Sequence, residues 1–251
     1  MGALGAAAAV AVYSWASQDL PSYSRVTDYR PLLVTTVYAR DGSVMGYFSK
    51  ERRFLVPLTA MPKYLPMAFL AIEDDKFYQH DGINIMAILR ASIKNFQAGS
   101  IKQGGSTITQ QVVKRLLLGD EKSYERKIKE AILAYRLEKH LSKDEILTIY
   151  LNQIFLGAGS YGVEAAARTY FAKHVNELTL AEAAVLAGLP QAPSKYNPLQ
   201  YRDEAIKRQH LVLGRMLELG WITKEQYDAA LVEQLAFKSM PEQTASYDAR
   251  Y

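Results

Sequence analysis

The spacing of hydrophobic positions divides the chain into a short extended region and a long helical region. Residues 33–38 and 44–48 are rich in β-branched and aromatic side chains, and the turn pair Asp41-Gly42 lies between them. These features predict a β-hairpin. From Pro66 onward the apolar residues recur at helical spacing. The pattern therefore predicts a mainly α chain with one small hairpin near its N-terminus.

Helix boundaries are indicated by residues that cap helix ends. A Ser or Thr followed three positions later by Glu or Gln predicts helix starts at Ser142, Thr179 and Thr223. Helices are also predicted over 83–96, from 106 or 107 to about 118, and over 123–140. Three prolines between 190 and 198 predict an irregular loop.

The two ends of the chain differ from its middle. The run from Gly2 to Trp15 is uncharged, but it is shorter than the roughly 20 apolar residues that span a bilayer. No lysine or arginine precedes it, as a signal peptide would require. We interpret residues 1–20 as the remnant of a transmembrane anchor, with a buried Ala-rich helix as the alternative. The polar residues 238–251 are interpreted as a linker.

Composition and charge narrow the function only slightly. The chain has no cysteine, which excludes disulfides, a thiolate nucleophile and a cysteine-ligated metal. Its net charge of +4 suits an anionic partner such as a lipid head group, pyrophosphate or nucleic acid. The basic residues alternate with acidic ones rather than forming a basic stripe, which disfavours nucleic acid.

An acidic cluster, Glu73-Asp74-Asp75, directly follows the apolar segment 67–72. A carboxylate at the edge of a buried face is partly desolvated, which raises its pKa and suits it to acid–base catalysis. An ordinary helix end with solvated acids explains the same residues equally simply.

Residues 104–111 read Gly-Gly-Ser-Thr-Ile-Thr-Gln-Gln, two glycines leading into a helix start. Such a start offers backbone N–H groups and hydroxyls to a phosphate. The stretch lacks the lysine of a P-loop, and a capped helix after a loop is the alternative interpretation.

Lys122, Arg126 and Glu130 are spaced at i, i+4 and i+8, so they share one face of a helix. Cations in a row suit a pyrophosphate, and the terminal carboxylate can hold a divalent metal bound to it. A solvated face of ordinary ion pairs explains the same pattern. A fourth stretch, residues 150–166, places glycines and polar side chains among apolar ones, which is typical of tight helix packing.

In this order the four stretches resemble the glycosyltransferase domain of bifunctional class A penicillin-binding proteins, the peptidoglycan glycosyltransferases. The resemblance covers residues 61–237 and includes a fifth stretch, residues 182–190 with Tyr196-Asn197-Pro198. It implies a mainly α, lysozyme-like fold with two lobes, a head and a jaw that dips into the membrane. Residues 21–60 would form a hairpin lead-in, and the polar C-terminal linker would run towards an absent transpeptidase domain.

The resemblance also implies a reaction. Lipid II would be polymerised into β-1,4-linked glycan with inversion at the donor anomeric carbon and release of undecaprenyl pyrophosphate. Glu73 matches the general base that takes the proton of the acceptor hydroxyl. Glu130 matches the second essential glutamate, which assists the leaving pyrophosphate directly or through a divalent cation, Mg²⁺ or Mn²⁺.

Further residues match the substrate site of this family. Lys114, Arg126 and Lys127 match residues that line the pyrophosphate, and Ser106, Thr107 and Gln111 match the polar edge of the donor site. Lys122 stands where the family commonly has arginine, so its charge is kept but bidentate geometry is lost. Asn152 is a further candidate for substrate binding, and Asp74 and His80 are expected to organise the site.

The partners implied are lipid II, the lipid-linked growing glycan, the membrane, the inhibitor moenomycin and other cell-wall synthesis proteins. The implied location is the outer face of the bacterial cytoplasmic membrane, held by a single-pass anchor. Two rival functions are a lysozyme-like hydrolase or lytic transglycosylase, and a non-catalytic membrane-associated scaffold. The Lys/Arg face argues against the hydrolase, and a scaffold leaves both glutamates without a purpose.

Overall fold

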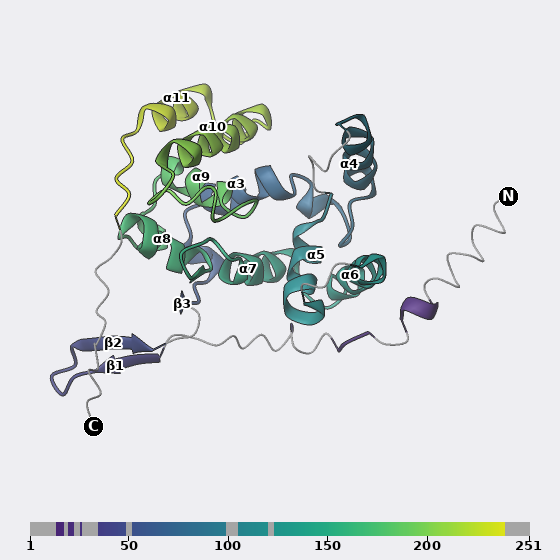
Figure 1. Cartoon of the computed structure of the whole chain (residues 1–251), viewed down its shortest axis with the longest axis horizontal. Coiled ribbons are helices and arrows are strands. Elements are labelled where there is room, and N and C mark those ends of the chain that lie inside the picture. Colours follow the sequence, from purple (N-terminus) through teal and green to yellow (C-terminus); the bar gives the residue numbers. More distant parts are fainter. Residues whose placement is uncertain are drawn as a thin grey trace. The chain divides into compact units, whose positions relative to one another are not determined.

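The computed structural model of the chain is mainly helical, as the periodicity predicted (Figure 1). It describes residues 14–17, 20–22, 26, 35–48, 52–98, 105–119 and 123–238. Most of the predicted anchor and linker lies outside these residues, as do Leu33, Val34, Gly104 and Lys122. In the described ranges, no helix combines the length and the apolar character needed to cross a membrane.

The predicted hairpin is confirmed. Strand β1 (Thr35–Tyr38) pairs antiparallel with β2 (Val44–Phe48), with one register shift near the turn. The carboxylate of Asp41 accepts hydrogen bonds from the backbone N–H and the hydroxyl of Ser43, at 2.9 and 2.6 Å. Gly42 has a φ of +82°, which a side chain would disfavour. The Asp-Gly pair therefore forms the turn in the way that the sequence predicted.

The chain divides into two compact units, which agrees in number with the two predicted lobes. The first unit contains residues 1–30 and 73–150, and the second contains residues 31–72 and 151–251. Helix α3 (Tyr64–Glu73) ends at the boundary, so Glu73 is the residue that begins the main part of the first unit.

The described part of the first unit is built from short and medium helices. They are η2 (Phe77–Gln79), α4 (Ile85–Ala98), α5 (Ile108–Val113), η3 (Lys114–Leu118), α6 (Tyr124–Leu137) and the start of α7 (Lys143–Gln153). Helix α5 packs against α6, with Ile108, Val112 and Leu133 fully or almost fully buried. The helix predicted to run to residue 118 is α-helical only to Val113, and its last turn is π-helical.

The second unit holds the larger share of the helices. Its described elements are β3 (Arg52–Arg53), η1 (Leu58–Ala60), α3, β4 (Ser160–Tyr161), α8 (Val163–Phe171), η4 (Val175–Glu177), α9 (Leu180–Gly188), α10 (Arg202–Glu218) and α11 (Lys224–Val232). Helix α9 is buried along nearly its whole length and packs on α10, with α11 beside them (Figure 1). Strand β3 pairs in parallel with β4.

All three predicted capping boxes are present. The side chain of Thr179 accepts from the backbone N–H of Glu182, whose carboxylate accepts from the N–H of Thr179. The same reciprocal bonds start α7 at Ser142 and α11 at Thr223. These side chains satisfy N–H groups that a helix start leaves without an intrahelical partner.

A buried carboxylate joins α8 to η4 in the second unit. Glu164 is 3% exposed and accepts hydrogen bonds from the backbone N–H of Val175 and from the side chains of His174 and Arg168. Burial alone would raise the pKa of Glu164. The hydrogen bonds from Val175, His174 and Arg168, together with the Arg168 charge, nevertheless lower that pKa below its usual value.

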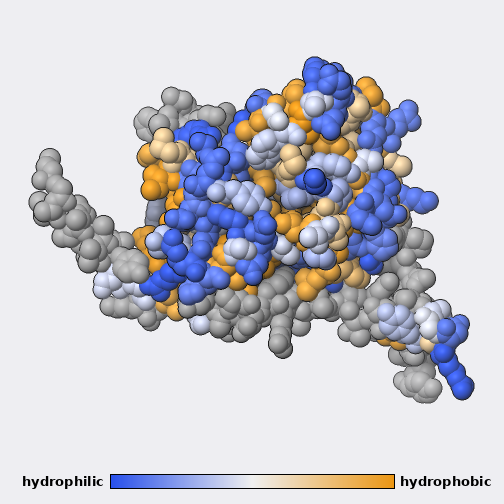
Figure 2. Space-filling view, turned by 180° about the vertical axis from the view of Figure 1, so that it is seen from behind, coloured by the Kyte–Doolittle hydropathy of each residue, from blue (hydrophilic) through white to orange (hydrophobic). Residues whose placement is uncertain are grey.

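The first helix after the acidic cluster exposes apolar side chains. In α4, Ile85 and Met86 are each 68% exposed and Leu89 is 53% exposed. Ile85, Ile88 and Leu89, three of the apolar positions that predicted this helix, are therefore exposed. On the face shown in Figure 2, hydrophobic residues are interspersed among hydrophilic ones rather than gathered in a single area.

Candidate active site

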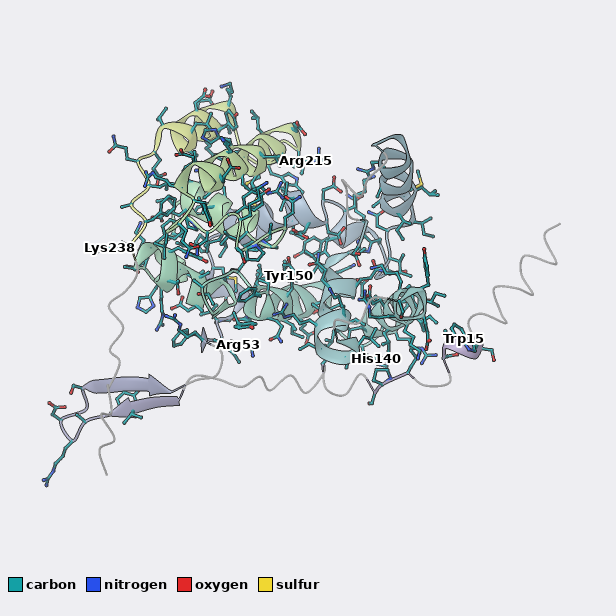
Figure 3. The ribbon with its side chains drawn as sticks, viewed as in Figure 1. Trp15, Arg53, His140, Tyr150, Arg215 and Lys238 are labelled. Atoms are coloured by element: carbon teal, nitrogen blue, oxygen red, sulfur yellow. The ribbon has the colours of Figure 1, made fainter. Side chains whose placement is uncertain are left out.

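Glu73 is the last residue of α3 and follows the buried segment Ala68–Ala71. The side-chain amide of Gln111, on α5, donates a hydrogen bond to Oε2 of Glu73 at 2.8 Å. Tyr150, on α7, lies among the side chains of the helices and is 2% exposed (Figure 3). Burial and the nearby charges of Glu73 and Asp74 raise the pKa of Tyr150 well above its usual value. Glu73 therefore lies beside a neutral amide and a buried phenol.

Asp74 connects the end of α3 to the start of α5. It is 6% exposed and accepts a hydrogen bond from the backbone N–H of Ile108 at 3.1 Å. Both of its carboxylate oxygens also lie 3.0 Å from Nε2 of His80. Asp74 therefore links the end of α3, His80 and the start of α5, and the role of Asp74 and His80 in organising the site stays a prediction.

The start of α5 is capped from within the protein. Thr107 and Gln110 form a reciprocal capping box, and the hydroxyl of Thr107 donates to the carbonyl of Gly82 at 2.6 Å. The N–H of Ile108 is bound by Asp74. These contacts favour the capped-helix interpretation of residues 104–111 over a helix start that offers its N–H groups to phosphate. Thr107 is 2% exposed, so its contacts give it a structural role.

Helix α6 carries a cluster of two cations, Arg126 and Lys127, around the carboxylate of Glu130. These three residues are called the α6 cluster below. Glu130 is 1% exposed. One of its oxygens accepts from Nη1 of Arg126, and the other accepts from Nζ of Lys127 at 2.6 Å. The same Nζ donates to the hydroxyl of Ser106 at 2.7 Å. The structure therefore brings together four of the residues predicted for the site.

An ion pair between Glu138 and Lys143 also holds α5 in place, and it was not predicted from the sequence. The hydroxyl of Thr109 donates to Glu138 at 2.5 Å. Nζ of Lys143 donates to Glu138 at 2.8 Å and to the carbonyl of His80 at 2.5 Å. It also lies 4.4 Å from the centre of the Phe77 ring. The pair depends on how α5, α6 and α7 pack, and no local sequence pattern reports that packing.

The remaining residues predicted for the site are Lys114, Lys122 and Asn152. Lys114 begins η3, three residues beyond Gln111, and is partly exposed. Lys122 lies outside the described residues. Asn152 is 2% exposed, and its amide accepts from the N–H and donates to the carbonyl of Val56, both at 2.9 Å. Asn152 therefore fixes a backbone segment, and its predicted role in substrate binding stays a prediction.

Because the chain has no cysteine, the potential metal-ligating side chains in the described part of the chain are carboxylates and histidines. No group of three His, Asp or Glu side chains in that part of the chain is placed to hold a metal ion. Glu130, the predicted metal ligand, directs one oxygen to Arg126 and the other to Lys127. A metal ion bound by Glu130 would have to share these oxygens with Arg126 and Lys127 or displace one of the two cations.

The model of the transglycosylase family matches residues 41–217, more than half of the chain. The chain therefore belongs to the transglycosylase family. The prediction of a peptidoglycan glycosyltransferase domain is confirmed at the level of the family.

Its curated relatives include the penicillin-binding proteins 1A of two bacteria. The protein of Neisseria flavescens is 49% identical over 219 residues, which cover 87% of this chain and 27% of the relative. That of Aquifex aeolicus is 49% identical over 221 residues, which cover 88% of this chain and 30% of the relative. This chain thus spans less than a third of their length. The crystal structure of penicillin-binding protein 1A from Haemophilus influenzae aligns with a TM-score of 0.48 and 33% identity, covering 84% of this chain and 22% of that one.

Proposed function

We propose that the domain polymerises lipid II into β-1,4-linked glycan strands, with inversion at the donor anomeric carbon and release of undecaprenyl pyrophosphate. The observation that carries this proposal is a continuous set of contacts. Glu73 is bound by Gln111 on α5, and Ser106, just before α5, is bound by Lys127 of the α6 cluster. A base and a group of cations are therefore linked through one short helix.

Glu73 is proposed as the base. Its carboxylate takes the proton of the acceptor hydroxyl as that oxygen attacks the anomeric carbon of the donor. The bond between that carbon and the pyrophosphate oxygen breaks, and its electron pair leaves with the pyrophosphate. Because pyrophosphate is already a good leaving group, this reaction needs a base and cationic stabilisation more than a strong acid.

The α6 cluster is proposed to stabilise the leaving pyrophosphate. Arg126 offers planar N–H donors that suit phosphate oxygens, and Lys127 offers a compact positive charge. Glu130 is buried between them and orients both cations, so it acts on the leaving group through its neighbours. Lys114 and Ser106 are proposed to complete the donor side of the site.

A divalent cation, Mg²⁺ or Mn²⁺, belongs to this proposal only as a partner brought by the substrate pyrophosphate, because Glu130 already binds two cationic side chains. Titration of the substrate-free chain with Mg²⁺ should then leave its melting temperature unchanged. A saturable increase in melting temperature would instead indicate a metal site held by the protein alone.

The proposal places the domain at a membrane surface. The exposed apolar residues Ile85, Met86 and Leu89 of α4 suit contact with lipid, as the membrane-dipping jaw of the resembled family implies. The outer face of the bacterial cytoplasmic membrane, a single-pass anchor, inhibition by moenomycin and contact with other cell-wall synthesis proteins complete the proposal.

The rival function is hydrolysis of peptidoglycan by a lysozyme-like enzyme or a lytic transglycosylase. Cleavage of an uncharged glycosidic bond has no use for the α6 cluster, which favours the glycosyltransferase. The test is incubation of the detergent-solubilised chain with lipid II or with preformed glycan. We expect glycan strands from lipid II. Cleavage of preformed glycan without any use of lipid II would contradict the proposal.

A further inference from the structure

We propose that Gln111 is a positioning residue for Glu73, a role that rests on the proposed function of Glu73 as the base. The side-chain amide of Gln111 donates to Oε2 of Glu73 at 2.8 Å. An N–H donor on one carboxylate oxygen fixes the plane of the group, and so sets the direction in which the other oxygen points. The resemblance places Gln111 only at the edge of the donor site, a role that does not require this contact.

The helix that carries Gln111 is held at three consecutive residues. Thr107 donates its hydroxyl to the carbonyl of Gly82, and Thr109 donates its hydroxyl to Glu138. Between them, the N–H of Ile108 is bound by Asp74. Gln111 therefore projects from a fixed helix start, and its amide has a defined position relative to the end of α3.

Consecutive carboxylates, Glu73 and Asp74, both bind α5, the first through Gln111 and the second through Ile108. Positions 108 and 111 are three residues apart and lie on one side of that helix. A glutamate at the last position of a helix would otherwise sample several rotamers, and ordering it has an entropic cost. The contact from α5 removes this freedom before substrate binds.

From the contact we also expect an effect on the charge of Glu73. A hydrogen bond donated to the ionised form of a carboxyl group favours that form and lowers its pKa. Among the described residues, Tyr150 on α7 is close enough to Glu73 for the charge of Glu73 to raise the pKa of Tyr150, and Asp74, the next residue, is paired with His80. Substitution at position 111 leaves Tyr150, Asp74 and His80 in place, so its effect on the acidic limb is compared at constant composition of these groups.

The test is the pH dependence of kcat/KM for lipid II, measured with the full chain. In Gln111→Met the donor is lost, and we expect the acidic limb of the profile to move to higher pH by about one pH unit. Gln111→Glu places a second carboxylate beside Glu73 and should move the limb further in the same direction. Gln79→Met makes the same change at an exposed residue of the first unit, and its profile should match that of the unaltered chain.

A merely structural or substrate-binding role gives a different result. An unshifted acidic limb with an increased KM would show that Gln111 contacts substrate only, and would overturn the positioning role. If thermal melting shows that the Met variant is unfolded, Gln111→Asn keeps the amide but is too short to reach Glu73, and the same shift is expected. The proposed base is tested separately, because a limb that does not move in Glu73→Asp would contradict the role of Glu73 itself.

Discussion

At the scale of single residues, Lys127 connects two parts of the proposed site, because its ammonium binds both Ser106 and Glu130. Replacing it with methionine removes one of the charges proposed to stabilise the leaving pyrophosphate. We expect Lys127→Met to lower kcat/KM for lipid II by about 100-fold, the usual effect of losing one group that stabilises developing charge.

Lys129 provides the matched control for this substitution. It lies on the same helix but pairs with Glu125, at 2.7 Å, rather than with Glu130. Lys129→Met removes an equal charge from α6 and should leave the rate close to that of the unaltered chain. Equal losses in the two variants would show that general positive charge, and not the α6 cluster, supports the reaction.

Glu164 is a residue whose role is stability. Its pKa is lowered in the folded chain, so its contribution is present above the ordinary value of 4.5 and is lost as the pH falls through the lower folded value. Glu164→Gln should reduce the free energy of unfolding by about 2 kcal/mol near neutral pH, and by much less in acid. Urea unfolding at both pH values measures this difference. Glu204→Gln, at an exposed pair with Lys207, should change little at either pH.

At the scale of elements, helix α5 controls the geometry of the site, and its N-cap can be tested against an equivalent one. Thr107 and Thr223 both begin helices with reciprocal capping boxes, but only Thr107 lies beside the site. Thr107→Ala and Thr223→Ala should each destabilise the chain by about 1 kcal/mol. Only Thr107→Ala should also reduce polymerisation of lipid II, since it releases α5 from Gly82. Equal activity of the two variants would contradict the importance of α5.

Elements were predictable from sequence where the signal is local. The hairpin at Asp41-Gly42 and the helix starts at Ser142, Thr179 and Thr223 follow from turn and capping chemistry that a few residues encode. The π-helical turn after Val113 was not predicted, because the hydrophobic period of so short a segment does not distinguish it from an α-helix.

Contacts between elements were predicted less well. The grouping of Arg126 and Glu130 follows from helical spacing. The Glu138–Lys143 pair instead joins the C-cap of α6 to the start of α7, and the bond from Gln111 to Glu73 joins α5 to α3. Asn152 was assigned by its place in a family motif, and the two bonds of its amide to the backbone of Val56 were not foreseen. The sequence therefore identified candidate site residues by their type and motif. The residues that they contact could be identified only from the packed structure.

At the scale of the whole molecule, the site contacts described above lie within the first unit. The chain spans less than a third of the length of the penicillin-binding proteins 1A that it matches. The proposed reaction therefore concerns this domain, and the proposal assigns it to Glu73, α5 and the α6 cluster.

The most direct test of the central claim is the conversion of lipid II into glycan by Glu73→Gln. This substitution removes the proposed base but keeps a side chain of the same size. We expect polymerisation to fall by at least about 100-fold, with an unchanged melting curve. Asp75→Asn, at the neighbouring acid outside the proposed site, should retain activity and serves as the control. A folded Glu73→Gln variant that polymerises lipid II at the rate of the unaltered chain would contradict the account.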